Sequence, residues 1–135
     1  MKKVLIIDGQ GGKIGSVFAE KIIKEQLPVE LLVVGTNAIA TQTMLKVGKI
    51  NGATGESAIC FNANNVDILI APVGLLFEYS FFGEVTPQMV EAIRKSNAEK
   101  IIIPFSQCNH YHFIGENISM SRIIELGYEK LKELI

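Results

Sequence analysis

The stretch of residues 4–16 constrains the fold of this chain more than any other. An apolar run, residues 4–7, ends at Asp8, and four glycines follow at positions 9, 11, 12 and 15. A helical pattern of apolar residues begins directly afterwards. The order of strand, tight loop and helix start is typical of a βα unit that presents backbone N–H groups to a phosphate.

The spacing of the glycines narrows the ligand class only partly. The strict dinucleotide fingerprint requires a third glycine at position 14, where this chain has Ile14. The looser pattern Gly-x-x-Gly-x-x-Gly is met by Gly9, Gly12 and Gly15. A nucleoside-triphosphatase loop fits less well, because Ser or Thr should follow Lys13. We expect the following loop residues to bind a phosphate-bearing ligand, with a glycine-rich turn that binds nothing as the alternative: Gly9, Gln10, Gly11, Gly12, Lys13 and Ile14.

Asp8 stands at the end of the first predicted strand, where its carboxylate would repel a nearby phosphate. We expect it to accept N–H bonds within the loop and to hold the shape of the loop. A metal or ribose contact is the alternative.

The remaining apolar runs indicate three more strands, at residues 29–34, 66–71 and 100–104, separated by helical patterns. Residues 51–57 are predicted as a glycine-bearing turn in which Thr54 caps a short helix to about residue 64. Alternating strands and helices predict an α/β fold, a Rossmann-like three-layer α/β/α domain with a parallel sheet in the order 2-1-3-4. We expect residues 1–135 to form one such nucleotide-binding domain.

In this fold, ligands bind outside the carboxyl ends of the strands, so two further segments should line the crevice. We expect them to contribute Gly35, Thr36, Asn37, Pro72, Val73 and Gly74. An Asp or Glu at the end of the second strand usually binds the ribose of NAD, and an Arg accommodates NADP, but neither is present. Thr36 and Asn37 are predicted as helix N-caps, with a ribose contact as the second interpretation.

Composition excludes several classes of function. The net charge is −1 and no basic run occurs, so we expect no nucleic-acid partner. The two cysteines make no disulfide framework, and the apolar run after Lys2 and Lys3 is too short for a membrane span, which predicts a cytoplasmic protein without a membrane partner.

The apolar surface predicts self-association. Hydrophobic residues make up 48% of the chain and charged residues only 20%, which leaves thin polar cover. Residues 38–47 and 75–82 carry one charge each, and we expect a homodimer or higher homo-oligomer through them. The alternative is that the apolar residues of 75–82 fill the core of a monomer.

Cys108, His110 and His112 alternate, so on a strand their side chains would share one face and resemble an open zinc site. The spacing matches no established zinc motif, and we expect no metal. A Cys–His nucleophile pair is a further alternative.

Two kinds of resemblance add to these patterns. The string Gly-Gln-Gly-Gly-Lys-Ile-Gly at 9–15 resembles the phosphate loops of dihydrodipicolinate reductases and of short-chain dehydrogenases, with Lys13 in place of a motif glycine of the latter. This resemblance implies NAD(P) binding. The motifs at 7–12, 35–38, 51–56 and 86–89 together resemble a family of short, uncharacterised bacterial proteins described as a domain of unknown function. That resemblance implies a stand-alone Rossmann-like domain with no established activity.

The sequence thus leads to a nucleotide- or dinucleotide-binding protein, with an NAD(P)-linked oxidoreductase as the narrower hypothesis and NAD or NADP as candidate cofactors. Catalytic residues stay unassigned, because the one Tyr-x-x-x-Lys pair, Tyr128 and Lys132, lies on the last predicted helix. The rival hypothesis is a non-catalytic homo-oligomeric regulatory or assembly module that keeps the fold without the ligand.

Overall fold

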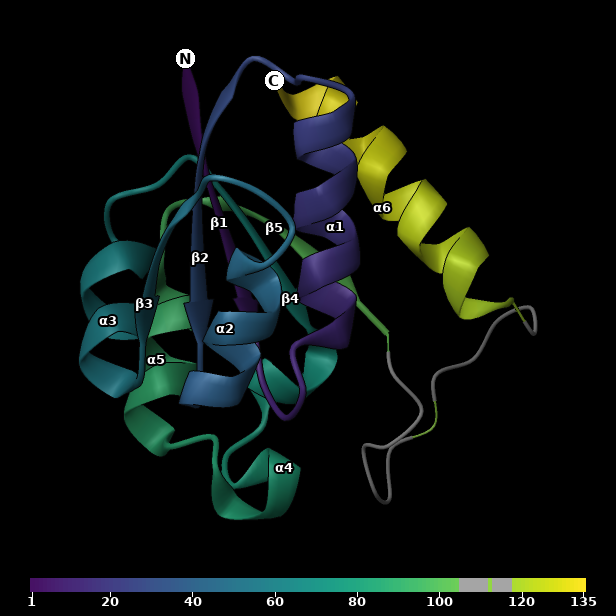
Figure 1. Cartoon of the computed structure of the whole chain (residues 1–135). Coiled ribbons are helices and arrows are strands. Elements are labelled where there is room, and N and C mark those ends of the chain that lie inside the picture. The colour runs from purple at the N-terminus through teal and green to yellow at the C-terminus, as the bar shows by residue number, and fades with distance from the viewer. Residues whose placement is uncertain (105–111, 113–117) are drawn as a thin grey trace.

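The computed structural model describes residues 1–104, 112 and 118–135. At its centre lies a parallel five-stranded sheet in the order β3-β2-β1-β4-β5 (Figure 1). The strands are β1 (Lys2–Asp8), β2 (Val29–Gly35), β3 (Asn51–Thr54), β4 (Ile68–Pro72) and β5 (Glu99–Ile103). The register pairs Asp8 with Gly35, so the loops that follow β1 and β2 leave the sheet side by side.

The predicted α/β fold and parallel sheet are confirmed, and the four predicted strands occur in the predicted relative order. The prediction missed β3, which pairs with residues 32–35 of β2 as an edge strand. Thr54 is therefore the last residue of a strand, and Gly55 is the N-cap of the next helix. Only Ala53 in this strand is apolar, so the strand lacks the alternating pattern from which strands are predicted.

Helices cover both faces of the sheet (Figure 1). One face is covered by α1 (Lys13–Lys24), α2 (Ala38–Leu45) and α6 (Met120–Leu134), and the other by α3 (Glu56–Ala63) and α5 (Pro87–Lys95). Side chains of β1 alternate between the two cores, with Val4 and Ile6 in the first and Leu5 and Ile7 in the second. This is why the strand reads as a continuous apolar run.

Three of the helices begin at capping side chains. Asn37, Thr86 and Ser119 each accept a backbone N–H bond at the start of α2, α5 and α6, and the cap at Asn37 was predicted. None of the helices in the described part of the chain is both long and apolar enough to cross a bilayer.

The apolar segment after β4 divides between core and surface. It forms a 3-10 turn, η1 (Val73–Leu76), and a short turn, α4 (Ser80–Gly83), in which Phe81 and Phe82 adopt left-handed backbone angles. Leu75 is buried, Leu76 and Phe81 are partly buried against the second core, and Phe82 is fully exposed. Neither alternative for this segment holds for all of its residues.

Candidate functional site

The loop between β1 and α1 is held from within by Asp8. Its buried carboxylate accepts the N–H of Gly9 at 2.8 Å through Oδ1 and the N–H of Gly15 at 2.7 Å through Oδ2. The two bonds join the start of the loop to the first turn of α1. The predicted role of Asp8 as the residue that shapes the loop is confirmed.

Burial also changes the proton affinity of this carboxyl. Desolvation raises the pKa of Asp8 above its ordinary value of 3.8, because the charged form loses water. The N–H groups of Gly15, Gly9 and Ile14 oppose this and lower the pKa, but the effect of burial is larger. The N–H groups thus stabilise the ionised carboxylate of Asp8, but the loss of hydration on burial outweighs them.

Each glycine of the looser pattern has its own steric reason. At Gly12 the backbone is left-handed, with φ of 72°, and a Cβ would lie 2.5 Å from the carbonyl oxygen of Ala40. At Gly15 a Cβ would lie 2.5 Å from the sulfur of Met44, so α1 packs closely on α2. Gly12 therefore makes the turn and Gly15 allows the helix to approach its neighbours.

Most N–H groups of the loop already have partners. Gly12 donates to the carbonyl of Gly9 at 2.9 Å, and Ser16 donates to that of Gly12 at 2.9 Å. The N–H groups of Gly11 and Lys13 have no hydrogen-bond partner among the described residues. Gly11 is exposed, and a Cβ there would meet no described atom within 4 Å, so this part of the loop is open to a ligand.

Phe81 brings the loops after β1 and β4 together. A Cβ at Gly9 would lie 2.6 Å from Cδ2 of the Phe81 ring, and a Cβ at Gly74 would lie 2.8 Å from its Cζ. The ring therefore fills the space between the two glycines, at the point where chain connections leave β1 in opposite directions. In folds of this class ligands bind at that point.

Glu84 connects the same segment to the loops after β1 and β2. Its Oε1 accepts hydrogen bonds from Thr36 Oγ1, from Asn37 Nδ2 at 2.9 Å and from the N–H of Gln10 at 3.3 Å. Asn37 Nδ2 also donates to the carbonyl of Gln10 at 2.9 Å. A single carboxylate oxygen thus joins three segments that are far apart in sequence.

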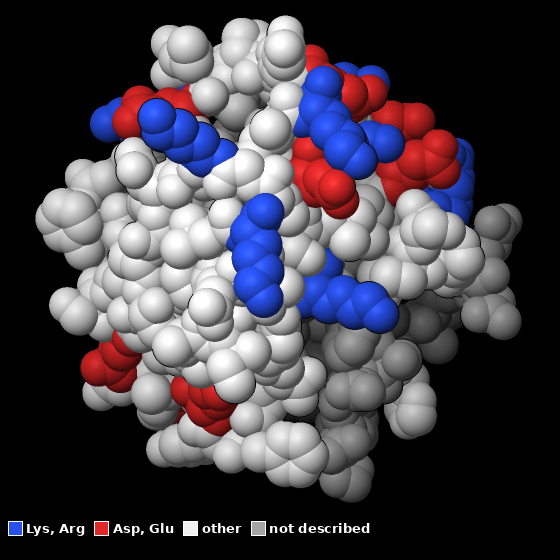
Figure 2. All heavy atoms as spheres, viewed as in Figure 1, with Lys and Arg blue, Asp and Glu red and all other residues white. Residues whose placement is uncertain are grey.

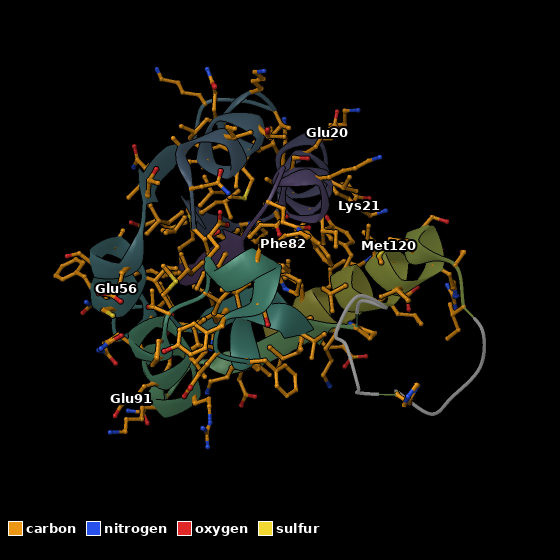
Figure 3. The ribbon with its side chains drawn as sticks, turned by 90° about the horizontal axis from the view of Figure 1, so that it is seen from below. Glu20, Lys21, Glu56, Phe82, Glu91 and Met120 are labelled. Carbon is orange, nitrogen blue, oxygen red and sulfur yellow. The ribbon has the colours of Figure 1, made fainter. Side chains whose placement is uncertain are left out.

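Charges around this end of the sheet are few. In Figure 2 the Lys and Arg side chains lie over the upper and middle parts of the molecule, and the lower part, where α4 lies, shows acidic and uncharged residues. Figure 3 looks onto this end, with Phe82 near the middle and Glu56 and Glu91 on the side of α3 and α5. Lys13 is the exposed cation of the loop itself.

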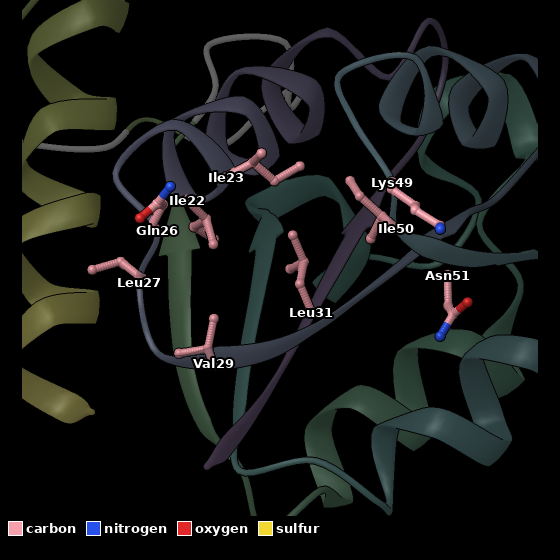
Figure 4. Close-up of a pocket in the computed structure, with 9 residues that line it drawn as sticks. All are labelled: Ile22, Ile23, Gln26, Leu27, Val29, Leu31, Lys49, Ile50 and Asn51. Atoms are coloured by element: carbon pink, nitrogen blue, oxygen red, sulfur yellow. The ribbon is translucent and has the colours of Figure 1, made fainter.

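Two hollows in the described part of the chain lie away from the glycine loop. One, of about 470 Å³, lies near the amino ends of β2 and β3 and is lined by the apolar side chains of Ile22, Leu27, Val29 and Ile50 (Figure 4). The other, of about 320 Å³, lies on the opposite face and includes Phe61 and Asn62. Both border the amino-terminal half of β2, whereas at the glycine loop the Phe81 ring fills the space between Gly9 and Gly74.

The predicted site residues converge on one end of the sheet. Gly9 and Gly74 face the Phe81 ring, and Thr36 and Asn37 face Glu84. Ile14 is half-buried on α1 against the first core, and Pro72 and Val73 are buried at the end of β4. Gly35 sits beneath Thr41, whose hydroxyl accepts its N–H at 3.1 Å.

Sequence reasoning missed Glu84 and treated Phe81 only as a residue of a subunit contact or of the core. No local spacing marks Glu84, because its carboxylate meets Asn37 across 47 positions in the chain. Cys108 and His110 lie outside the described residues, and His112 is exposed. Tyr128 and Lys132 pack together on α6, with Lys132 Nζ 5.3 Å from the ring centroid, and Lys21 of α1 lies over the same ring at 4.9 Å.

The comparisons with known proteins give a family and one distant structural likeness. A family model described as a domain of unknown function, DUF3842, matches residues 3–135. No curated protein matches the chain. One similar solved structure is a dodecameric FMN-dependent UbiX-like decarboxylase from Escherichia coli O157:H7. It is 11% identical, with a TM-score of 0.49, and the match covers 96% of this chain and 76% of that chain. This likeness is too low to bear on ligand or assembly.

Proposed function

The chain belongs to the DUF3842 family, a domain of unknown function, and from the geometry of its loops we propose that it binds a nucleotide or dinucleotide. Membership confirms the family resemblance carried by its four motifs. The observation that supports binding is the β1–α1 loop, which Asp8 holds in shape while the N–H groups of Gly11 and Lys13 stay unpaired. Such N–H groups at a helix N-terminus bind phosphate well.

The ligand would lie across the ends of β1, β2 and β4. Its phosphate would bind at Gly11 and Lys13, its ribose near Thr36 and Asn37, and the remainder beside residues 72–74. The Phe81 ring now fills part of that path, so binding requires the ring to leave Gly9 and Gly74. Gly83, which lies between Phe81 and Glu84, has a φ of 91° and gives the backbone a point about which the ring could move.

NAD and NADP are the narrower candidates, supported by the glycine spacing. A bound nicotinamide cofactor would supply hydride transfer. Catalysis of the short-chain dehydrogenase type gains no support from Tyr128 and Lys132, because the Tyr128 ring packs against Lys21 of α1 and Lys132 of its own helix. The proposal therefore stops at binding.

Thermal-shift measurements with NAD, NADP, FAD, ATP, GTP and S-adenosylmethionine at millimolar concentration test it. A ligand at 100 times its Kd stabilises the folded state by about 2.7 kcal/mol. Stabilisation by none of the six would contradict nucleotide binding.

The best variant to block the phosphate position is Gly11→Asp, since Gly11 is exposed and has free space around it. Its carboxylate should abolish ligand stabilisation while the fold is kept, and Gly11→Asn is the uncharged control of equal size. Gly12→Asp is unsuitable, because the left-handed backbone and the carbonyl of Ala40 leave no room for a side chain.

The filled crevice favours a second candidate, a non-catalytic homo-oligomeric regulatory or assembly module. Under this hypothesis Phe81 and Glu84 replace the ligand and fasten the three loops permanently. The thermal-shift experiment separates the two hypotheses. The module would self-associate, and nucleotides would stabilise neither the wild type nor Gly11→Asp.

A further inference from the structure

An acid is missing where folds of this class usually carry one. The last residues of β2 and its loop are Gly35, Thr36 and Asn37, and none can accept two ribose hydroxyls as a carboxylate does. Glu84 comes from the segment between α4 and α5, yet its carboxylate lies against Thr36 and Asn37. The structure thus places an acid at the end of β2 from another part of the chain.

The hydrogen bonds orient this carboxylate. All three donors, from Thr36, Asn37 and Gln10, bond to Oε1. Oε2 has no hydrogen-bond partner within the described part of the chain. One oxygen therefore anchors the group, and the other keeps its lone pairs for a hydroxyl.

Asn37 fixes the direction of the arrangement. Its Oδ1 accepts the N–H of Ala40 at 2.8 Å as the N-cap of α2, so its Nδ2 has to face Gln10 and Glu84. An amide nitrogen only donates, and its partner has to accept. This amide therefore fixes Oε1 of Glu84 as an acceptor and holds the carboxylate in one orientation.

We propose that Glu84 is the residue that selects the sugar of the nucleotide, with Oε2 accepting the ribose hydroxyls of a ligand whose phosphate binds at Gly11 and Lys13. This inference rests on the proposed nucleotide binding. A carboxylate accepts bonds from a free diol and repels a phosphate on the 2′-oxygen. The protein therefore prefers a nucleotide with an unphosphorylated ribose, NAD over NADP.

Calorimetric titration tests this preference. NAD and NADP are titrated into the full chain, into its Glu84→Gln variant and into its Glu78→Gln variant. Glu78 is an exposed acid on the same segment, so Glu78→Gln removes an equal charge without touching Thr36 or Asn37. We expect wild type and Glu78→Gln to bind NAD about tenfold or more tightly than NADP, and Glu84→Gln to lose most of that ratio by binding NADP better. A purely structural role for Glu84 would weaken both ligands equally.

The variant keeps an oxygen acceptor for the three donors, and urea unfolding checks that it stays folded. A second variant, Glu84→Ala, should also lose the ratio. An NAD-to-NADP ratio unchanged in both variants, or a wild type that binds the two equally, overturns this inference while nucleotide binding stands. Absence of binding by wild type overturns the proposed function and this inference together.

Discussion

The Asp8 carboxylate accepts the N–H of Gly15 at 2.7 Å and so closes the glycine loop onto the first turn of α1. In Asp8→Asn the amide keeps one accepting oxygen and turns an NH₂ group toward a second N–H donor. Leaving that buried donor unpaired should lower the free energy of unfolding by about 1–3 kcal/mol. Urea unfolding at neutral pH measures the difference.

The stabilities of wild type and Asp8→Asn, compared as a function of pH, report the titration of Asp8. Because burial raises the pKa of Asp8 above 3.8, the folded protein binds this proton more tightly than the unfolded chain. The contribution of Asp8 to stability is then complete below pH 3.8 and decreases as the pH rises toward the raised pKa. The stability advantage of wild type over Asp8→Asn should shrink over this window. An advantage that grows with pH would show that the pKa is lowered instead.

Gly9 and Phe81 should be energetically coupled. Gly9→Ala places a methyl group 2.6 Å from the ring, which should cost about 1–3 kcal/mol of stability. In the Phe81→Ala background the ring is gone, so the same change should cost less, with a coupling energy of about 0.5–3 kcal/mol. Gly11→Ala is the control, because its methyl group would meet no described atom within 4 Å. Equal costs of Gly9→Ala in both backgrounds would show that the ring does not rest on Gly9.

Phe82 has a left-handed backbone, with φ of 58°, and a fully exposed side chain. A glycine there should relieve the backbone strain without loss of buried contacts. We expect Phe82→Gly to be about 1 kcal/mol more stable than Phe82→Ala, or about 4 °C in Tm. Since both variants lack the ring, differential scanning calorimetry of the two isolates the backbone effect. A more stable alanine variant would mean that residue 82 is not left-handed in solution.

Self-association through the exposed aromatic residues is a separate prediction. Tyr79 is 65% exposed, and Ile39, on α2, is 68% exposed; both lie near the carboxyl ends of the strands, as does Phe82. We expect light scattering at micromolar concentration to give about twice the 14.8 kDa of one chain, and Phe82→Asp to reduce this to the monomer mass.

Phe82→Asp is a sharper test than a change at Phe81, which contacts Gly9 and Gly74 within its own chain. The exposed Phe61 on α3 supplies the control, since Phe61→Asp adds the same charge at the other end of the sheet and should leave the mass unchanged. A monomer mass for wild type, independent of concentration, would contradict the prediction.

The layers of the fold could be predicted from the sequence, because buried strands and helices show local patterns of apolar residues. The run at residues 4–7 is apolar throughout since helices cover both faces of β1, and Thr86 before Pro87 marks the start of α5. Strand β3 has no such pattern, because its place at the edge depends on backbone pairing with β2. Backbone pairing of this kind cannot be predicted from the side chains alone.

The site was predictable only as a set of loops. Gly9, Asn37 and Gly74 follow strand ends, and the carboxyl ends of parallel strands share one edge. Glu84 reaches Asn37 across 47 positions in the chain, and Phe81 reaches Gly9 from a turn in which Phe81 and Phe82, rather than glycines, are left-handed. Neither contact leaves a mark in local spacing or propensity.

The left-handed turn at Phe81 and Phe82 also bears on how quickly a ligand could enter. A nucleotide that uses this crevice binds only the fraction of molecules in which the ring has left Gly9, so its association rate reaches a ceiling at high concentration. Two left-handed non-glycine residues raise the free energy of the closed form by about 1–2 kcal/mol each. Opening that relaxes these two residues would recover this strain, so the strain would enlarge the open population and speed the entry of a ligand.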